Sequence, residues 1–337
     1  MAPTPIPAAP RPLPPPVLVM TCGEPAGIGP EIAARLTGDG GPPFAWMGDP
    51  AHLPPGTSWH EIAAPAEVTA VPPGRLPVLR HAFPAPTSPG RPDPANAAAV
   101  IAVIERAVAL VQAGKAAGLV TCPISKAALI TGAGFAFPGH TEFLAHLAGG
   151  VEVAMMLACA ELRVVPATIH IPLSEVPRAL TAEGLAATIR LTHGALTRDF
   201  GVEAPRIAVA GLNPHAGEGG AMGREEAELI APTLDRLRAE GMALAGPLPA
   251  DTMFHPAARA RYDAAVCMYH DQALIPIKTI DFDGGVNVTL GLPFVRTSPD
   301  HGTAFDIAGK GRANPASLRA ALHMAARMAT RRAGLTP

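Results

Sequence analysis

Three histidines of this sequence stand where an α/β protein gathers its ligands. His170 and His270 end or directly follow apolar segments that read as buried strands, and His215 follows a third such segment. Ligands of open α/β sheets collect at the carboxyl ends of strands, and three neutral imidazoles with one open position are typical of a catalytic Zn²⁺ site. The alternative is three structural or surface histidines, because their spacing matches no local zinc motif. The three predicted strands cover residues 164–170, 206–211 and 264–269.

Basic and hydroxyl side chains indicate a second site, one for an anion. Lys278 and Arg296 each lie beside an apolar segment, and their cationic groups there are good partners for a phosphate or a carboxylate. The turn 139–142 precedes a predicted helix and offers the imidazole of His140 and the hydroxyl of Thr141 at its N-terminus, which also suits an anion. The alternatives are surface solvation of the two cations and ordinary helix capping by Thr141.

Two glycine-rich loops connect predicted strands to predicted helices. The loop 23–31 fits neither the G-x-G-x-x-G pattern nor the P-loop pattern, so it is either a tight turn or an anion site. The loop 211–223 holds five glycines and His215, and it suits close approach of the backbone to a ligand; the alternative is a flexible surface loop. Glu225 and Glu226 follow in the first turn of the next helix, where they are interpreted as capping residues.

Strands alternate with helices along most of the chain, which predicts an α/β fold with a mixed, largely parallel sheet and helices on both faces. Further strands are predicted over 17–21, 44–47, 77–79, 118–121, 154–159 and 286–290. Helices are predicted over 32–36, 95–112, 143–147, 174–180, 182–200, 224–240 and 315–331. Eight prolines among residues 1–16 predict a disordered or polyproline-II tail before the first strand.

Composition narrows the class of protein. The 337 residues carry 26 Lys and Arg against 28 Asp and Glu, so the net charge of −2 makes a nucleic-acid partner unexpected. Apolar stretches such as 153–160 are far shorter than the roughly 20 residues that span a bilayer, so no membrane partner is expected either. The four cysteines form no C-x-x-C pair, which predicts reduced thiols in a cytoplasmic protein. The length suggests two domains, or one large α/β unit with an insertion.

Six motifs occur in order between about residue 17 and residue 330. They are 23–31 (GEPAGIGPE), 139–144 (GHTEFL), 212–220 (LNPHAGEGG), 246–252 (GPLPADT), 269–272 (YHDQ) and 285–293 (GVNVTLGLP). Together they resemble the 4-hydroxythreonine-4-phosphate dehydrogenase family of pyridoxal phosphate biosynthesis. The chain departs mildly from the family pattern, with Ser125 in place of the usual Asn and Ala273 where Gly is common.

The resemblance implies an isocitrate/isopropylmalate dehydrogenase-like fold with an active-site cleft between two domains. The first domain would comprise residues 17–130 with 281–337, and the second residues 131–280, with the metal ligands and the dimer interface. His170, His215 and His270 would bind a divalent metal, zinc in first place with magnesium and cobalt as alternatives. In this family the metal site is shared between the two subunits of a homodimer, and the partner supplies the third histidine.

The resemblance also implies a reaction. The enzyme would oxidise 4-phosphohydroxy-L-threonine with NAD or NADP to a 3-oxo acid that decarboxylates to 3-amino-2-oxopropyl phosphate. Asp271 or Asp251 would serve as the base. The residues that would bind the substrate are His140, Thr141, Lys278, Asn287 and Arg296. Relatives within the family that act on 4-phospho-D-threonate, 4-phospho-D-erythronate or an aromatic cis-dihydrodiol carboxylate are the alternatives.

Overall fold

The computed structural model describes residues 16–335 and contains one sheet of 12 strands. Its strand order is β3-β4-β2-β1-β5-β12-β11-β6-β7-β10-β8-β9. The central strand β11 pairs antiparallel with β12 and β6, and β6 pairs antiparallel with β7, whereas the remaining neighbours are parallel. The predicted α/β class with a mixed, largely parallel sheet is therefore confirmed. Residues 1–15 of the predicted tail lie outside the described residues.

The strands are β1 (Leu18–Thr21), β2 (Phe44–Gly48), β3 (Trp59–Glu61), β4 (Leu76–Arg80), β5 (Gly118–Thr121), β6 (Ala154–Ala158), β7 (Arg163–Pro166), β8 (Arg206–Ala210), β9 (Ala243–Leu248), β10 (Ala264–Cys267), β11 (Val286–Leu290) and β12 (Arg296–Pro299). The α-helices are α1 (Gly29–Ala34), α2 (Ala97–Gln112), α3 (Lys126–Ala133), α4 (His140–Leu147), α5 (Val176–Ala179), α6 (Ala182–Arg198), α7 (Ala231–Ala239), α8 (Pro256–Arg259), α9 (His270–Ile280) and α10 (Ala316–Arg332). Every predicted strand has a counterpart, but the strands β3, β9 and β12 and the helices α3, α8 and α9 were not predicted.

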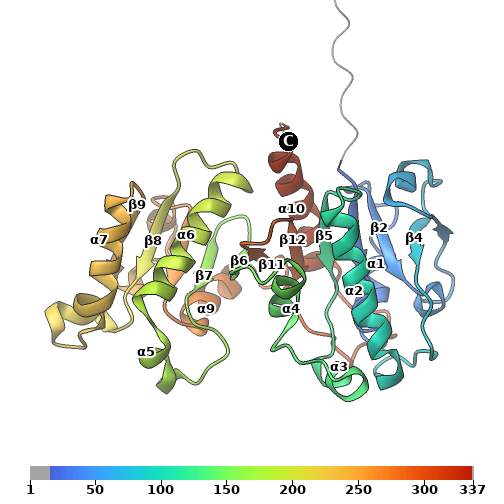
Figure 1. The fold of residues 1–337 in the computed structure, drawn as a ribbon, viewed down its shortest axis with the longest axis horizontal. Coiled ribbons are helices and arrows are strands. Elements are labelled where there is room, and N and C mark those ends of the chain that lie inside the picture. Colours follow the sequence, from blue (N-terminus) through green and yellow to red (C-terminus); the bar gives the residue numbers. More distant parts are fainter. Residues whose placement is uncertain (1–15, 336–337) are drawn as a thin grey trace, which may run out of the picture.

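The antiparallel strands at the centre divide the sheet into two parallel runs that point in opposite directions. One run contains β1, β5 and β12, and the other contains β7, β10 and β8. Figure 1 shows β8 and β9 with α6 and α7 at one end of the molecule, and β2 and β4 with α1 and α2 at the other. Because β6 and β11 are paired, the sheet is continuous across the predicted domain boundaries, and the division into residues 17–130 with 281–337 and 131–280 stays a prediction.

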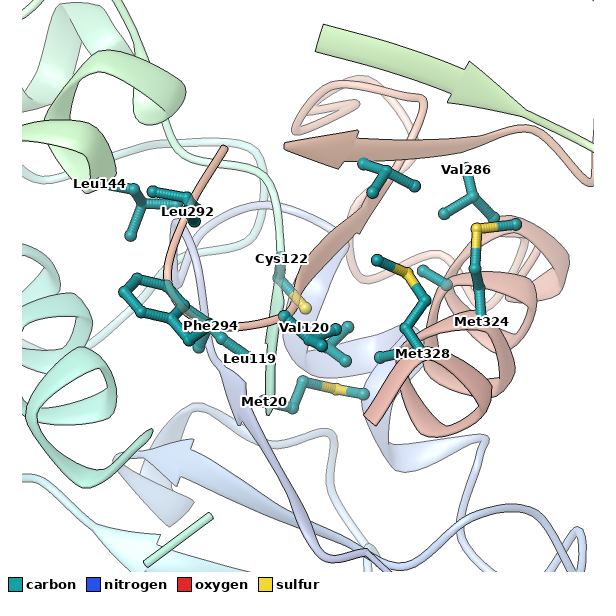
Figure 2. Packing of buried hydrophobic residues seen from close by; sticks show 14 of the residues in the cluster. Met20, Leu119, Val120, Cys122, Leu144, Val286, Leu292, Phe294, Met324 and Met328 are labelled. Carbon is teal, nitrogen blue, oxygen red and sulfur yellow. The ribbon is translucent and has the colours of Figure 1, made fainter. Parts of the chain in front are cut away.

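The helix α10 covers the strands at the centre of the sheet. It packs against β12, β5 and β11, and Figure 2 shows Met324 and Met328 beside Val120 and Val286. The unbranched methionine side chains adapt to the irregular gap between helix and strands. Thr297, on the face of β12 toward this helix, donates its hydroxyl to the carbonyl of Ala321 at 2.8 Å. The opposite face of the same strand is thereby left for other contacts, because side chains alternate along a strand.

One described helical segment, Pro94–Gln112, is long and apolar enough to cross a membrane by length and composition. Its apolar positions Val100, Val103, Ile104 and Ala107 are buried, and the helix packs on β1, β5 and β2. A core helix of an α/β protein has this same composition.

The four cysteines are free and buried, as the predicted reduced thiols require.

Candidate active site

The structure brings His170 and His270 together. Strand β7 ends at Pro166, so His170 lies four residues beyond it on a turn, and the prediction of a strand to residue 170 is wrong at that end. His270 is the first residue of α9, three positions after the last residue of β10. The two imidazole rings have centroids 5.7 Å apart and line a cavity of about 240 Å³ together with Asp271.

A carboxylate accompanies two of the three histidines. His270 Nδ1 lies 2.7 Å from an oxygen of Asp271, and His215 Nδ1 lies 3.1 Å from an oxygen of Glu218. A carboxylate that accepts from Nδ1–H fixes the tautomer and leaves Nε2 free as a metal ligand. The chemistry of these side chains therefore fits a divalent cation such as zinc, cobalt or magnesium, with imidazole best suited to the first two.

Within a single chain, the ligand atoms of the three histidines are not close enough together to bind one metal ion. Among residues 16–335, the group whose ligand atoms all lie within 4.8 Å of one another is Cys159, Glu161 and Asp281. His215 belongs instead to the loop Pro214–Gly220, which follows β8. One chain thus presents His170 and His270 as neighbours and His215 from a separate segment.

The backbone is strained at two of these histidines. His170 has φ of 54° and His215 has φ of 52°, in the left-handed region that non-glycine residues seldom adopt. Each such conformation costs on the order of 1–3 kcal/mol and persists only where surrounding contacts impose it; strain of this kind clusters at functional sites. The histidines are therefore held in place rather than freely mobile.

Glu226 holds the loop that carries His215. Its side chain is buried and accepts hydrogen bonds from the backbone N–H of Asn213 at 2.7 Å and from the Asn213 amide at 3.0 Å. Glu225 accepts from the same amide at 2.7 Å. Glu226 lies in the first turn of the helical segment Glu226–Ile230, as predicted, and its carboxylate in addition holds the loop. The described loop is pinned by charge-assisted hydrogen bonds, contrary to a freely flexible segment.

Arg296 is buried at the first position of β12, with 3% of its surface exposed. Its guanidinium donates to the hydroxyl of Thr121 on β5 at 2.7 and 3.1 Å and to that of Thr289 on β11 at 2.9 Å. These partners are neutral, and no carboxylate among residues 16–335 lies within ion-pair distance. Burial lowers the pKa of Arg296 to about 10, while the carboxylate of Glu142 acts in the opposite direction. Surface solvation does not explain this cation.

His140 and Asn287 present unpaired polar atoms next to this guanidinium. His140 begins α4, and its Nε2 is buried without a hydrogen-bond partner; burial, and secondarily the charge of Arg296, lower its pKa well below the usual value. The Oδ1 atom of Asn287 on β11 is also buried and unpaired. Gly139, and not Thr141, is the N-cap of α4, so the capping alternative for Thr141 is wrong. A buried cation beside unpaired polar atoms suits a small anionic ligand.

Lys278 is the more exposed cation of the predicted set. It lies in the last turn of α9, and its Nζ forms an ion pair with Asp300 at 2.7 Å. Asp300 directly follows β12. The helix α9 starts instead at His270, beside the run of parallel strands that contains β7, β10 and β8. Eight residues of helix separate the Cα atoms of His270 and Lys278 by about 12 Å. In one chain, His270 and Lys278 thus lie at opposite ends of α9.

Both candidate bases line one hollow. Asp251 and Asp271 contribute to a cavity of about 450 Å³, together with Tyr269, Gln272 and Ile275. Asp271 also borders the smaller cavity of His170 and His270. The structure therefore places Asp251 and Asp271 at the histidine end of α9, and Asp271 is already engaged with His270.

A further cavity was not predicted. About 950 Å³ in volume, it lies between the start of α1 and the loop before α10, and Gly27, Glu31, Gly309 and Gly311 are among its lining residues. Gly309 has φ of +71°, and a Cβ there would meet the ring of Pro89 at 2.7 Å, so both backbone and space require glycine. Glu31 accepts from the N–H of Gly309 at 3.1 Å, which fixes this wall. In the sequence, only the glycines of residues 23–31 indicated a site in this region.

The fold and these residues together define an α/β protein with one candidate site for a small anion and one for a cation. Residues 47–325 match the family described as "Pyridoxal phosphate biosynthetic protein PdxA". The chain is 66% identical over 319 residues to 4-hydroxythreonine-4-phosphate dehydrogenase of Paracoccus denitrificans, covering 94% of this chain and 98% of that protein. The chain belongs to this PdxA family, so the expectation of an oxidoreductase of pyridoxal phosphate biosynthesis is confirmed.

Solved structures agree with this assignment. The crystal structure of 4-hydroxythreonine-4-phosphate dehydrogenase from Klebsiella pneumoniae is 38% identical with a TM-score of 0.86, covering 93% of this chain and 99% of that one. A terephthalate 1,2-cis-dihydrodiol dehydrogenase from Burkholderia xenovorans is 28% identical with a TM-score of 0.66, covering 96% and 99%. The fold that the resemblance implied is thereby confirmed.

Proposed function

We propose that this protein oxidises 4-phosphohydroxy-L-threonine with NAD or NADP. The resulting 3-oxo acid loses CO₂ to give 3-amino-2-oxopropyl phosphate, in the biosynthesis of pyridoxine 5'-phosphate. The observation that carries this proposal is the buried guanidinium of Arg296, which has neutral partners and stands beside the unpaired atoms of His140 and Asn287. The phosphate of this substrate would supply the missing negative charge.

The substrate would be bound by residues from three elements. Arg296 would form charge-assisted hydrogen bonds to the phosphate, and Lys278 would approach it as a point charge. His140 and Thr141 would contact it from the N-terminus of α4, where backbone N–H groups favour an anion. The unpaired Oδ1 of Asn287 would accept a hydrogen bond from a substrate donor.

His170, His215 and His270 would hold a divalent cation, with zinc first and magnesium or cobalt as alternatives. When bound, the cation supplies Lewis-acid chemistry to the oxygen atoms of the substrate. Either Asp251 or Asp271 would accept the proton of the substrate hydroxyl, since both line the hollow at this end of α9. The bond between Asp271 and His270 also suits a second role, in which Asp271 orients that imidazole.

The 950 Å³ cavity is proposed as the dinucleotide site, because its volume is at the upper end of the roughly 300–1,000 Å³ of small-molecule sites. Its glycine-rich walls allow close approach of the backbone to a ligand. NAD or NADP bound there would accept the hydride from the substrate. The four buried free thiols support a reducing, cytoplasmic location.

We further propose a homodimer in which each metal site draws on both subunits. Two observations support it: the three histidines do not converge within one chain, and α9 separates them from Lys278 of the same chain. Large apolar side chains are exposed around His170 and on α9, with Leu173 66% and Ile275 63% exposed. Exposed apolar groups beside a polar site are typical of an interface, and a second copy of this chain is the occupant proposed.

Mixing inactive variants tests the shared site. His170→Ala, His215→Ala and His270→Ala subunits are combined in the three possible pairs at equal ratio and allowed to exchange. If one histidine comes from the partner subunit, two of the three mixtures regain activity. Half of the dimers are then mixed and each holds one intact site, so recovery approaches about a quarter of the wild-type activity.

The silent mixture identifies the two histidines that belong to the same subunit. The resemblance implies that the partner subunit supplies His270, in which case the mixture of the His170 and His215 variants stays inactive. The ring contact between His170 and His270 instead favours His215 as the histidine that the partner supplies. In that case the mixture of the His170 and His270 variants stays inactive. Absence of rescue in all three mixtures, with subunit exchange verified by mass spectrometry, would overturn the shared site.

The substrate itself is tested by direct comparison. Purified protein with Zn²⁺, Co²⁺ or Mg²⁺ and either NAD or NADP is offered 4-phosphohydroxy-L-threonine or 4-phospho-D-erythronate. We expect reduced dinucleotide and released CO₂ with the phosphorylated threonine, at a kcat/KM at least about tenfold above that for the erythronate, a difference of about 1.4 kcal/mol. A preference for the erythronate, or for an aromatic cis-dihydrodiol carboxylate, would replace the proposed substrate.

A further inference from the structure

Gln272 links the segments that carry the three histidines. Its Oε1 accepts the backbone N–H of Met268 at 2.7 Å, and its Nε2 donates to the carbonyl of Gly211 at 2.8 Å. Met268 lies between β10 and His270, and Gly211 directly follows β8, four residues before His215. One side chain thus bridges the His270 segment and the His215 segment.

The His170 segment is attached to the same point. Thr168, two residues before His170, donates its hydroxyl to the carbonyl of Met268 at 2.7 Å. Met268 is fully buried, so both of its backbone groups depend on these two side chains. Through Met268, the chain of hydrogen bonds runs from Thr168 to Gln272 and on to Gly211.

We infer that Gln272 is a positioning residue that sets the relative placement of the three histidine segments; this inference rests on the proposed function. A backbone N–H only donates and a carbonyl only accepts, so the side chain at this position must accept on one atom and donate on the other. A primary amide does both, whereas a carboxylate of the same shape would face the carbonyl of Gly211 with a second acceptor. His170 and His215 both have a left-handed backbone conformation, which persists only where contacts with other segments hold it.

Metal binding by the full-length protein tests the inference. Co²⁺ is titrated into metal-free wild type, Gln272→Met and Gln272→Glu, and followed by the visible absorption of histidine-bound Co²⁺. Methionine keeps the length of the side chain without its hydrogen bonds. We expect Co²⁺ affinity to fall about 10- to 100-fold in both variants, as is usual when groups that orient metal ligands are lost, and the absorption bands to shift. The kcat should fall while KM for the phosphorylated substrate stays within about twofold.

Gln112→Met is the matched control, because Gln112 also donates its amide to a carbonyl, that of Leu147, far from the histidines in sequence. It should bind Co²⁺ as wild type does. If Gln272→Met does not fold, Thr168→Val probes the same network from the other side and should weaken Co²⁺ binding in the same direction. Wild-type affinity and spectra in folded Gln272→Met or Thr168→Val would overturn the positioning role. Absence of Co²⁺ binding by wild type would instead overturn the proposed metal site.

Discussion

Replacing His170, His215 or His270 by alanine is expected to abolish oxidation of the phosphorylated substrate while leaving a folded protein. A site of three protein ligands loses its cation or its geometry when one imidazole is removed. None of the three side chains belongs to the buried core, and His215 and His270 are 63% and 39% exposed. The loss should therefore appear in activity and in bound metal, measured by elemental analysis, and the thermal unfolding midpoint of the metal-free protein should stay unchanged.

His60→Ala is a suitable control for these variants, because His60 is exposed on the edge strand β3, far from the histidine segments in the order of the sheet. It should retain metal and activity. Alanine has the same restriction as histidine at positive φ, so it does not relieve the strain of the left-handed backbone. The variants His170→Gly and His215→Gly relieve it, and they therefore separate backbone strain from ligand loss. Full activity with unchanged metal content in any alanine variant would remove that histidine from the site.

Replacing Arg296 by alanine is expected to raise KM for the phosphorylated substrate about 10- to 100-fold, with little change in KM for the dinucleotide. The charge-assisted hydrogen bonds that the guanidinium would make to a phosphate contribute about 1.5–3 kcal/mol. The substitution also leaves the hydroxyls of Thr121 and Thr289 without their shared donor, so some loss of stability accompanies it. Arg296→Lys retains the charge without the planar fork, and it should recover part of the lost affinity.

Lys278→Ala provides the comparison within the same site. Its ammonium is 36% exposed and already paired with Asp300, so the rise in KM should be smaller than for Arg296→Ala. The measurement is steady-state kinetics at saturating dinucleotide, with thermal unfolding midpoints recorded for each variant. Unchanged KM in both folded variants would mean that neither cation binds the phosphate.

The local pattern of the chain was sufficient for most of the fold. Buried strands such as β5 and β8 and long helices such as α6 and α10 were predicted, because each buries a continuous or periodic apolar set that local sequence displays. The helix α9 was missed because polar residues open it and Pro276 interrupts it. The strand β12 was missed because Arg296, Thr297 and Ser298 are polar, and their burial depends on neighbouring strands.

What the sequence determined by itself was which side chains could do chemistry. The histidines, Arg296 and the family motifs were all visible in it, since residue type and order do not depend on folding. The tertiary structure decided how these residues meet: the ring contact of His170 with His270, the neutral hydroxyl partners of Arg296, and the role of Glu226 in holding the loop of His215. It also revealed the network through Gln272 and the cavity of about 950 Å³. The long-range contacts among these features join residues 61 to 278 positions apart. Such contacts arise from the packing and pairing of whole elements, which local periodicity does not encode.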